Sequence, residues 1–214
     1  GFVGVVMAFL DTQGWHPLAS AAVMLAFGLL YGAFQGFIID FCEIHGFIVT
    51  LAGLFLLRGA CFMVTLDSIP IRHPFVDTFT DTYIELPGDG FLTSSAMVML
   101  VVLVIAIVIA HFTRFGTNVY AIGGDRISAR NAGIPTERLT IGLFMLSGFA
   151  AAFVGVSQAM VYQSAQVAGG QSFIFNSIMC VVIGGVLLTG GFGSVVGILL
   201  GTITFSMVNQ GIYF

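Results

Sequence analysis

Charged side chains are scarce in this chain, and one kind is missing altogether. Of its 214 residues, 7% are charged and 58% are hydrophobic, and all 6 basic residues are arginines because the chain has no lysine. A soluble domain carries roughly 25% charged residues, so this composition excludes a chain that covers its whole surface with water-facing groups. So few basic side chains also exclude a nucleic-acid-binding protein. The composition predicts an α-helical protein that crosses a membrane several times.

Residue patterns that carry enzyme chemistry are also missing. The phosphate-binding pattern G-x-x-x-x-G-K-[ST] is absent, as are the nucleophile pattern G-x-S-x-G and the metal pattern H-E-x-x-H. The cysteines lack C-x-x-C spacing and the histidines are scattered; they are Cys42, Cys61, Cys180, His16, His45, His73 and His111. We therefore expect no catalytic residue, no metal site and no ATP hydrolysis on this chain itself.

Apolar runs alternate with polar stretches along the chain. The runs cover 1–10, 18–39, 47–66, 94–112, 139–162, 173–188 and 194–212. We expect an all-α fold, a polytopic transmembrane helical bundle that forms one domain over 1–214, with about six to seven membrane segments of about 20 residues each. The run 173–188 is short and contains a glycine pair, so a tilted, broken or re-entrant helix is expected there. Because the chain begins and ends inside apolar runs, we expect it to be truncated at both ends.

The charges that do occur predict the topology. The stretch 113–138 holds four arginines, at Arg114, Arg126, Arg130 and Arg138, whereas 67–93 is acidic with one arginine. Short cytoplasmic loops carry an excess of basic residues. We therefore expect 113–138 to be a cytoplasmic loop and 67–93 to be a loop on the opposite, periplasmic side.

Glycine recurs at every fourth position in two of the apolar runs. The first set is Gly28, Gly32 and Gly36, and the second is Gly193, Gly197 and Gly201. Small residues at this spacing line one helix face and let another backbone approach closely, so both sets are candidate helix-packing faces. The repetition indicates either an internal duplication, which is common in transporters, or chance in a chain with 28 glycines.

A few polar side chains lie inside or beside the apolar runs. Arg58 is the charged residue well inside one of them; it either lines a polar path or has a structural role by snorkelling or pairing with helix carbonyls. Amides bind sugar hydroxyls without burying a charge, and they also bridge helices. As a group they favour a neutral polar substrate over an ion. The candidate substrate path comprises Thr50, Arg58, Gln35, Asn176, Asn209 and Gln210, and Gln158 is a further amide of this kind.

The stretch 113–138 has an internal pattern of its own. Residues 125–132 predict a short helix, with Asp125 as its N-cap and Gly133 followed by Ile134-Pro135 as its stop. Such a helix in a cytoplasmic loop either fits a groove on a partner or is an ordinary solvated connector.

Motifs spread over nearly the whole chain resemble those of a known family. They are Phe47–Leu51 (FIVTL), Arg58-Gly59, Tyr120–Gly124 (YAIGG) with Ala129, Arg130 and Gly133-Ile134, Val181–Gly185 (VVIGG), Gly190–Gly193 with Gly197 and Gly201, and Asn209–Gly211. In order and spacing they resemble the membrane permease subunits of bacterial ATP-binding-cassette importers for ribose, xylose and galactose, which are related to branched-chain amino-acid permeases. The stretch 68–79 looks most like galactofuranose-importer permeases within that group.

The resemblance implies a function and partners. It implies a multi-pass permease in the bacterial inner membrane, in contact with lipid, that imports a monosaccharide by alternating access. It also implies a second permease subunit (a homodimer or a heterodimer), a periplasmic sugar-binding protein, and a cytoplasmic ATPase that binds ATP and Mg²⁺, with no cofactor on this chain. The residues implied to couple the permease to the ATPase are Tyr120, Gly123, Gly124, Asp125, Arg126, Ala129, Arg130, Gly133 and Ile134.

Departures from the family pattern leave the substrate open. His45-Gly46 stands where many members have Pro-Pro, Ile174 and Asn176 stand where an acidic pair is frequent, and Asp125 stands where Asn is usual. The alternatives are a branched-chain amino-acid or nucleoside permease of the same superfamily, an ATP-independent secondary transporter or channel, and a structural membrane protein. A secondary transporter usually places an ionisable couple in the membrane, which this chain does not show.

Overall fold

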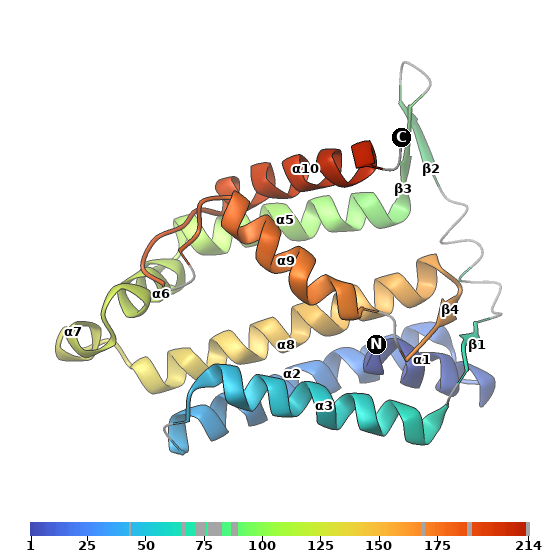
Figure 1. Cartoon of the computed structure of the whole chain (residues 1–214), viewed down its shortest axis with the longest axis horizontal. Coiled ribbons are helices and arrows are strands. Elements are labelled where there is room, and N and C mark those ends of the chain that lie inside the picture. Colours follow the sequence, from blue (N-terminus) through green and yellow to red (C-terminus); the bar gives the residue numbers. More distant parts are fainter. Residues whose placement is uncertain are drawn as a thin grey trace. The chain divides into compact units, whose positions relative to one another are not determined.

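The structure is largely helical, as expected from the sequence. The computed structural model describes residues 1–42, 44–65, 67–71, 76, 83–86, 90–167, 170–187 and 190–212. Its helices are α1 (Phe2–Thr12), α2 (Pro17–Phe41), α3 (Gly46–Val64), α5 (Ser94–Phe112), α6 (Arg114–Gly124), α7 (Arg126–Asn131), α8 (Thr136–Val161), α9 (Gln171–Ile183) and α10 (Val195–Ile212) (Figure 1). Its strands are β1 (Ile69–Pro70), β2 (Tyr83–Leu86), β3 (Gly90–Thr93) and β4 (Ser164–Ala165).

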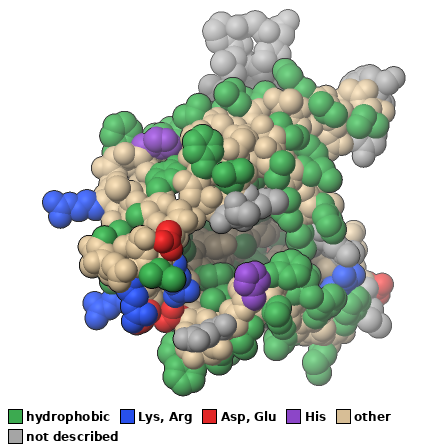
Figure 2. Space-filling view, turned by 60° about the vertical axis from the view of Figure 1, so that its left-hand side comes forward, with side chains coloured by type: hydrophobic (Ala, Val, Ile, Leu, Met, Phe, Trp, Pro, Cys, Tyr) green, Lys and Arg blue, Asp and Glu red, His purple; other side chains and the backbone are tan. Residues whose placement is uncertain are grey.

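The membrane-length helices confirm the polytopic architecture. Among the described residues, 5 helices are long and apolar enough to cross a bilayer, namely α2, α3, α5, α8 and α10. Two more helices, α1 and α9, are apolar but shorter. Large side chains on these helices face outward: Leu30, Val101 and Leu200 are 67%, 60% and 58% exposed. Green apolar groups accordingly cover much of the surface in Figure 2, as expected where lipid is the solvent. The chain is a multi-pass membrane protein.

Helix α9 is too short to cross a bilayer alone, as the short run 173–188 predicts. Its 13 residues rise about 20 Å, against a hydrocarbon core of about 30 Å. It ends in a Schellman motif: the Gly185 amide donates to the Val182 carbonyl (3.0 Å) and the Val186 amide to the Val181 carbonyl (3.2 Å). The glycine pair seen in the sequence therefore terminates the helix.

The described chain divides into two compact units. The first comprises Gly1–Val98 and Thr140–Gly170, and the second comprises Met99–Leu139 and Gln171–Phe214. In the first unit, α1 packs on α2 and α3, and α8 runs alongside α2 (Figure 1). The core of this unit includes Val5, Met7 and Ala8 from α1, which are almost completely buried.

The glycine face of α2 packs against α8. A methyl group added at Gly28 would lie 2.6 Å from the Gly148 carbonyl oxygen, and one added at Gly36 would lie 2.9 Å from the Ile141 Cα. Between them, Gly32 lies against the backbone carbonyl of Phe144. All three positions of the predicted stripe therefore meet backbone of α8, at distances that only glycine permits.

The second glycine set lies at the α9–α10 hairpin of the second unit. A methyl group at Gly201 would lie 2.8 Å from the Gly184 Cα, and Gly197 lies against the Gly184 carbonyl. Gly193 packs instead on the Val186 side chain, 2.8 Å from an added methyl group. The C-terminal end of α9 and the start of α10 thus meet through backbone.

Two short antiparallel strand pairs accompany the helices. β1 pairs with β4, with Ile69 opposite Ala165, and β2 pairs with β3 as a hairpin, with Tyr83 opposite Thr93. The sequence did not predict either pair. Both β1 and the hairpin belong to the acidic stretch 67–93, whose periplasmic position stays a prediction. Asp77, Asp81, Asp89 and Arg72 lie outside the described residues, as does most of the stretch 68–79.

The α2–α8 contact predicts a stability difference between two glycine substitutions. Gly28→Ala places a methyl group 2.5 Å from the Ala152 Cβ, and overpacking of this kind costs about 1–3 kcal/mol. Gly59→Ala on α3 is the matched control, because nothing lies within 4 Å of its added methyl group and alanine favours the helix. We expect Gly28→Ala to lower the thermal unfolding midpoint of the full-length protein in detergent and Gly59→Ala to leave it unchanged or higher. Equal midpoints would contradict the packing role of Gly28.

Candidate functional site

The arginine-rich stretch 113–138 is built from two short helices and the start of α8. Thr113 caps α6, with its hydroxyl accepting a hydrogen bond from the Gly116 amide (3.4 Å). Gly116 is buried where α5 turns into α6, and a methyl group there would lie 2.8 Å from the Ala110 Cα. The sequence predicts the helix at 125–132, which the structure shows as α7, but it does not predict α6 as a separate helix. The cytoplasmic position of this stretch stays a prediction.

Asp125 joins the two helices. Its backbone amide donates to the Ala121 carbonyl at the end of α6 (3.3 Å). Its side chain caps α7, with Oδ1 accepting from the Ile127 amide (3.0 Å) and Oδ2 from the Ser128 hydroxyl (2.5 Å). The hydrogen bond from Ser128 and then that from Ile127 lower the pKa of Asp125 from its ordinary value. One residue therefore sets the angle between α6 and α7.

Gly133 ends α7. Its φ of +82° lies in the left-handed region, which glycine adopts without a steric penalty. Its amide donates to the Arg130 carbonyl (3.0 Å), and the Ile134 amide donates to the Ala129 carbonyl (3.1 Å). This Schellman motif completes the helix that the sequence predicts, from its N-cap to its stop.

Helix α7 presents an apolar side chain among charges. Ala129 is 4% exposed and anchors the helix, whereas Ile127 is 73% exposed. Arg130 pairs with Glu137 at 3.5 Å, with both side chains largely exposed. Figure 2 shows most of the visible basic side chains at the left of the view, with acidic side chains beside them. We call the exposed face formed by 125–131 the α7 surface. Ile127 is not among the coupling residues predicted from the sequence. Its position as an apolar residue within the polar sequence DRISARN is the signal that could have predicted its exposure.

The end of α6 touches the stretch between α9 and α10. Gly123 lies against Gly191, with an added methyl group 2.8 Å from the Gly191 amide nitrogen. The structure thus brings together two glycine motifs that lie far apart in the sequence. Tyr120, one turn earlier on α6, is 36% exposed.

The candidate path residues of the first unit have different surroundings. Thr50 donates to the Gly46 and Phe47 carbonyls of its own helix (2.9 and 3.1 Å). Gln35 lies with Tyr31 against Gly53, so its amide sits between α2 and α3. Arg58 is half-buried on α3 and has no ion-pair partner among the residues that the structure describes. Gln35 therefore packs where α2 meets α3, and its place on a substrate path stays a prediction, as does that of Thr50 and Arg58.

The remaining candidates belong to the second unit. Asn176 is half-buried on α9, while Asn209 and Gln210 are exposed at the end of α10. Their membership of a substrate path stays a prediction.

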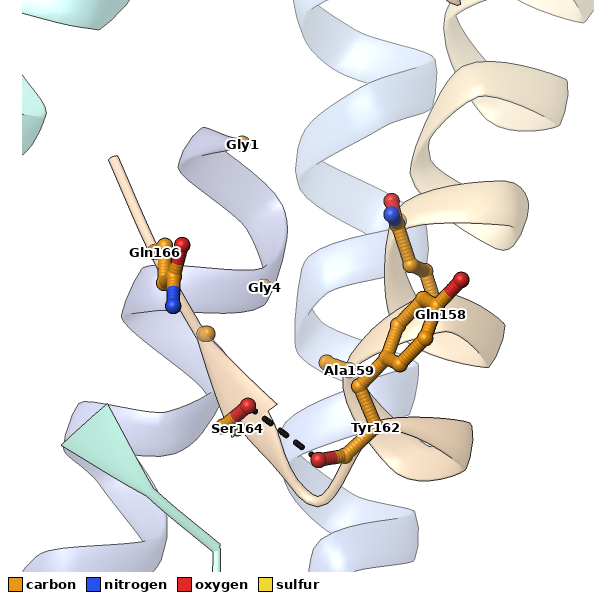
Figure 3. Close-up of a pocket in the computed structure, with 9 residues that line it drawn as sticks. Gly1, Gly4, Gln158, Ala159, Tyr162, Ser164 and Gln166 are labelled. Carbon is orange, nitrogen blue, oxygen red and sulfur yellow. Dashed lines mark hydrogen bonds between the residues drawn. The ribbon is translucent and has the colours of Figure 1, made fainter. Parts of the chain in front are cut away.

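A cavity of about 300 Å³ lies in the first unit, between α1, α8 and β4 (Figure 3). Gln158 lines it from α8, Tyr162 from the turn just after α8, and Gln166 from the segment after β4. The Ser164 hydroxyl donates to the Tyr162 carbonyl at its rim (3.1 Å). Within the described residues, the side chains of Gln158, Tyr162 and Gln166 form no hydrogen bond, so their polar groups are free for a ligand. The sequence shows Gln158 only as one amide among several, and it gives no sign of Tyr162 or Gln166.

The capping role of Asp125 predicts a pH-dependent α7. Because folding lowers the pKa of Asp125, its stabilisation of α7 is fully present above the ordinary value of 3.8 and is lost as the pH falls through the lowered folded value. We expect Asp125→Ala to raise amide hydrogen exchange in 126–131 at neutral pH, and wild type to approach that behaviour only in acid, after correction for intrinsic rates. Ser128→Ala should give a smaller effect, since the Ile127 bond remains. Unchanged protection in Asp125→Ala would contradict the cap.

Comparisons with known proteins cover nearly the whole chain. The family model described as "Branched-chain amino acid transport system / permease component" matches residues 2–214. The chain is 41% identical over its whole length to the inner membrane ABC transporter permease protein YjfF of Escherichia coli (strain K12), of which it covers 65%. It is 32% identical to the ribose import permease protein RbsC of the same organism, over 98% of this chain and 65% of that protein.

A further relative is the fructose import permease protein FruG of Bifidobacterium longum (strain NCC 2705), 31% identical over 97% of this chain and 65% of that protein. The chain therefore spans about two-thirds of the length of these curated relatives. No solved structure matches the chain. All three relatives are named as permeases rather than enzymes. The chain belongs to the permease component family of branched-chain amino acid transport systems.

Proposed function

We propose that this chain is the membrane-spanning part of an ATP-driven, binding-protein-dependent importer that moves a monosaccharide into the cytoplasm by alternating access. Family membership and the names of the sugar-importing relatives support this function. The protein lies in the bacterial inner membrane and works with a second permease subunit. ATP and Mg²⁺ bind to a partner ATPase, and this chain carries no cofactor.

The observation that carries the proposal is the α7 surface. An isoleucine that is 73% exposed on a helix with charged neighbours is unfavourable in water and favourable in an apolar pocket of a partner. Arg126 and Arg130 lie on the same helix and Arg138 lies near the start of α8, so that the arginines of 125–138 outnumber Asp125 and Glu137. An excess of positive charge steers an acidic partner surface. A helix in a groove is a common recognition mode. The partner that we propose for the α7 surface is the ATPase. A periplasmic sugar-binding protein delivers the substrate on the opposite side of the membrane.

The cavity in the first unit supports a neutral substrate. Two amides, a phenol and a serine hydroxyl line it beside the backbone of Gly1 and Gly4, and no Asp, Glu, Lys or Arg side chain does. Amides and aromatic groups match the hydroxyls and apolar faces of a sugar. An amino acid carries two charges, which need charged or strongly polar partners when water is removed. This difference favours a monosaccharide over a branched-chain amino acid, which remains the second candidate because of the family's description.

The function is tested with the full-length permease, its ATPase and its binding protein in liposomes. We expect one sugar from a panel of pentoses and hexoses in pyranose and furanose forms to stimulate ATP hydrolysis and to accumulate inside. We expect Ile127→Asp to abolish co-purification of the ATPase, because a charge replaces the apolar group, and Ile127→Leu to retain it. Transport without any associated ATPase would overturn the importer and favour a secondary transporter. Stimulation by leucine or a nucleoside alone would overturn the sugar assignment.

The cavity makes a separate prediction about substrate affinity. Gln158→Leu removes an amide while keeping a similar volume, and a lost hydrogen bond costs about 1 kcal/mol. We expect the KM for sugar to rise about five-fold, with ATPase association unchanged. The control is Ser157→Ala on the same helix, which does not line the cavity. An unchanged KM for Gln158→Leu would remove the cavity from the substrate path.

A further inference from the structure

Two glycine pairs from distant parts of the chain lie against each other in the second unit. A methyl group added at Gly190 would lie 2.7 Å from the Gly123 carbonyl oxygen, and one added at Gly191 would lie 2.9 Å from the Gly124 Cα. Side-chain carbons almost never approach other atoms this closely. The contact is therefore backbone against backbone, and no side chain separates the two stretches.

Short hydrogen bonds hold the stretch around Gly190 and Gly191 in shape. The Leu187 amide donates to the Phe192 carbonyl (3.0 Å), and the Gly190 amide donates to the Leu187 carbonyl (3.0 Å). Gly190 and Gly191 have φ values of +93° and +80°, which other residues adopt only with strain. The turn is thus built to present bare backbone to α6.

The same turn is tied to both helices that it connects. On one side it follows the Schellman motif that ends α9, where Gly184 packs against α10, with an added methyl group 2.6 Å from the Gly197 carbonyl oxygen. On the other side the Ser194 hydroxyl accepts from the Gly197 amide (2.9 Å) in the first turn of α10. A displacement of the turn therefore displaces the ends of α9 and α10 together.

The other partner, α6, leads directly into the α7 surface. Gly123 and Gly124 are its last residues, and Asp125 joins them to α7 with hydrogen bonds in both directions. A force on α7 thus reaches Gly123 through a single capped residue. Close-packed contacts of this kind transmit displacement because they cannot be compressed.

We propose that Gly190 and Gly191 are positioning residues that transmit movement of α6 and α7 to α9 and α10. The inference rests on the proposed function, since it requires a partner ATPase that moves α7. Helix α9 ends before it crosses the bilayer, and helices of that kind line cavities or protein rather than lipid. Movement of the α9–α10 hairpin would therefore displace Asn176, Asn209 and Gln210, the candidate path residues of this unit.

The test compares two glycine substitutions with equal backbone strain. Gly190→Ala places a methyl group against Gly123 at a φ of +93°, whereas Gly185→Ala has a φ of +77° and nothing within 4 Å of its added methyl group. Both are made in the full-length permease, assembled with its ATPase and binding protein in liposomes. The readout is sugar transported per ATP hydrolysed, together with ATPase co-purification. We expect Gly190→Ala to lower this ratio at least about five-fold relative to Gly185→Ala, with the ATPase still bound.

A second substitution tests the contact from its other side. Gly123→Ala places a methyl group 2.8 Å from the Gly191 nitrogen without a positive φ. It therefore tests the transmission role even if Gly190→Ala fails to insert into the membrane. We expect the same loss of transport per ATP. The double variant Gly123→Ala/Gly190→Ala should lose less than the product of the two single losses, because both substitutions disrupt the same backbone contact.

The outcomes separate this inference from the proposed function. If wild type couples ATP hydrolysis to sugar import and Gly190→Ala and Gly123→Ala couple as well as Gly185→Ala, the transmission role is wrong and the importer stands. If wild type binds no ATPase, the proposed function fails first. If all substitutions lower the ratio equally, backbone strain rather than the contact is responsible, and the inference is overturned.

Discussion

Close approach of backbones at glycine is the constraint on which this structure depends. Helices in lipid gain little from burying apolar side chains, because the surrounding tails are equally apolar, so van der Waals contact between backbones becomes important. The chain uses this contact where α2 meets α8, where α9 meets α10, and where α6 meets the turn at Gly190. At each place main-chain atoms of the facing segment are among the nearest atoms. The large side chains are thereby left to face outward, as Leu30 and Val101 do.

Helix α7, which lies in the polar stretch 113–138, is stabilised differently, by hydrogen-bonded caps at both ends. Helix α7 has only six residues, which is too short to be stable from intrinsic propensity. Asp125 satisfies amides at its start, the Gly133 motif satisfies carbonyls at its end, and Ala129 packs underneath. With its backbone satisfied locally, the helix can leave Ile127 exposed. An exposed apolar group on a locally braced helix is what a partner surface requires, and what a loose connector lacks.

Much of the fold could be predicted from the sequence, because local signals determine it. Hydrophobic runs predict the membrane helices, and Asp125 and Gly133 predict α7 at nearly its observed bounds. The fourfold glycine spacing indicated packing faces, although only the structure shows which helix each face meets. Helix α6 was missed because Gly116, Gly123 and Gly124 lower its helix propensity, while contacts elsewhere stabilise it. The β1–β4 pairing and the contact between Gly123 and Gly191 join segments far apart in the chain, which no local pattern reveals.

The polar residues also differ in how far sequence could interpret them. An amide in an apolar run has two possible roles, and burial alone does not distinguish them. Gln35 lies against Gly53 of α3 and hydrogen-bonds Tyr31 of its own helix, so its amide already has a partner. The Gln158 amide has no such partner among the described residues and borders a cavity instead. An amide that is already bonded stabilises the helices, whereas an amide that is free at a cavity gains its hydrogen bond only when a ligand arrives. The proposed neutral, hydroxyl-rich substrate requires an amide of the second kind, because such an amide offers a hydrogen bond without placing a charge in the membrane.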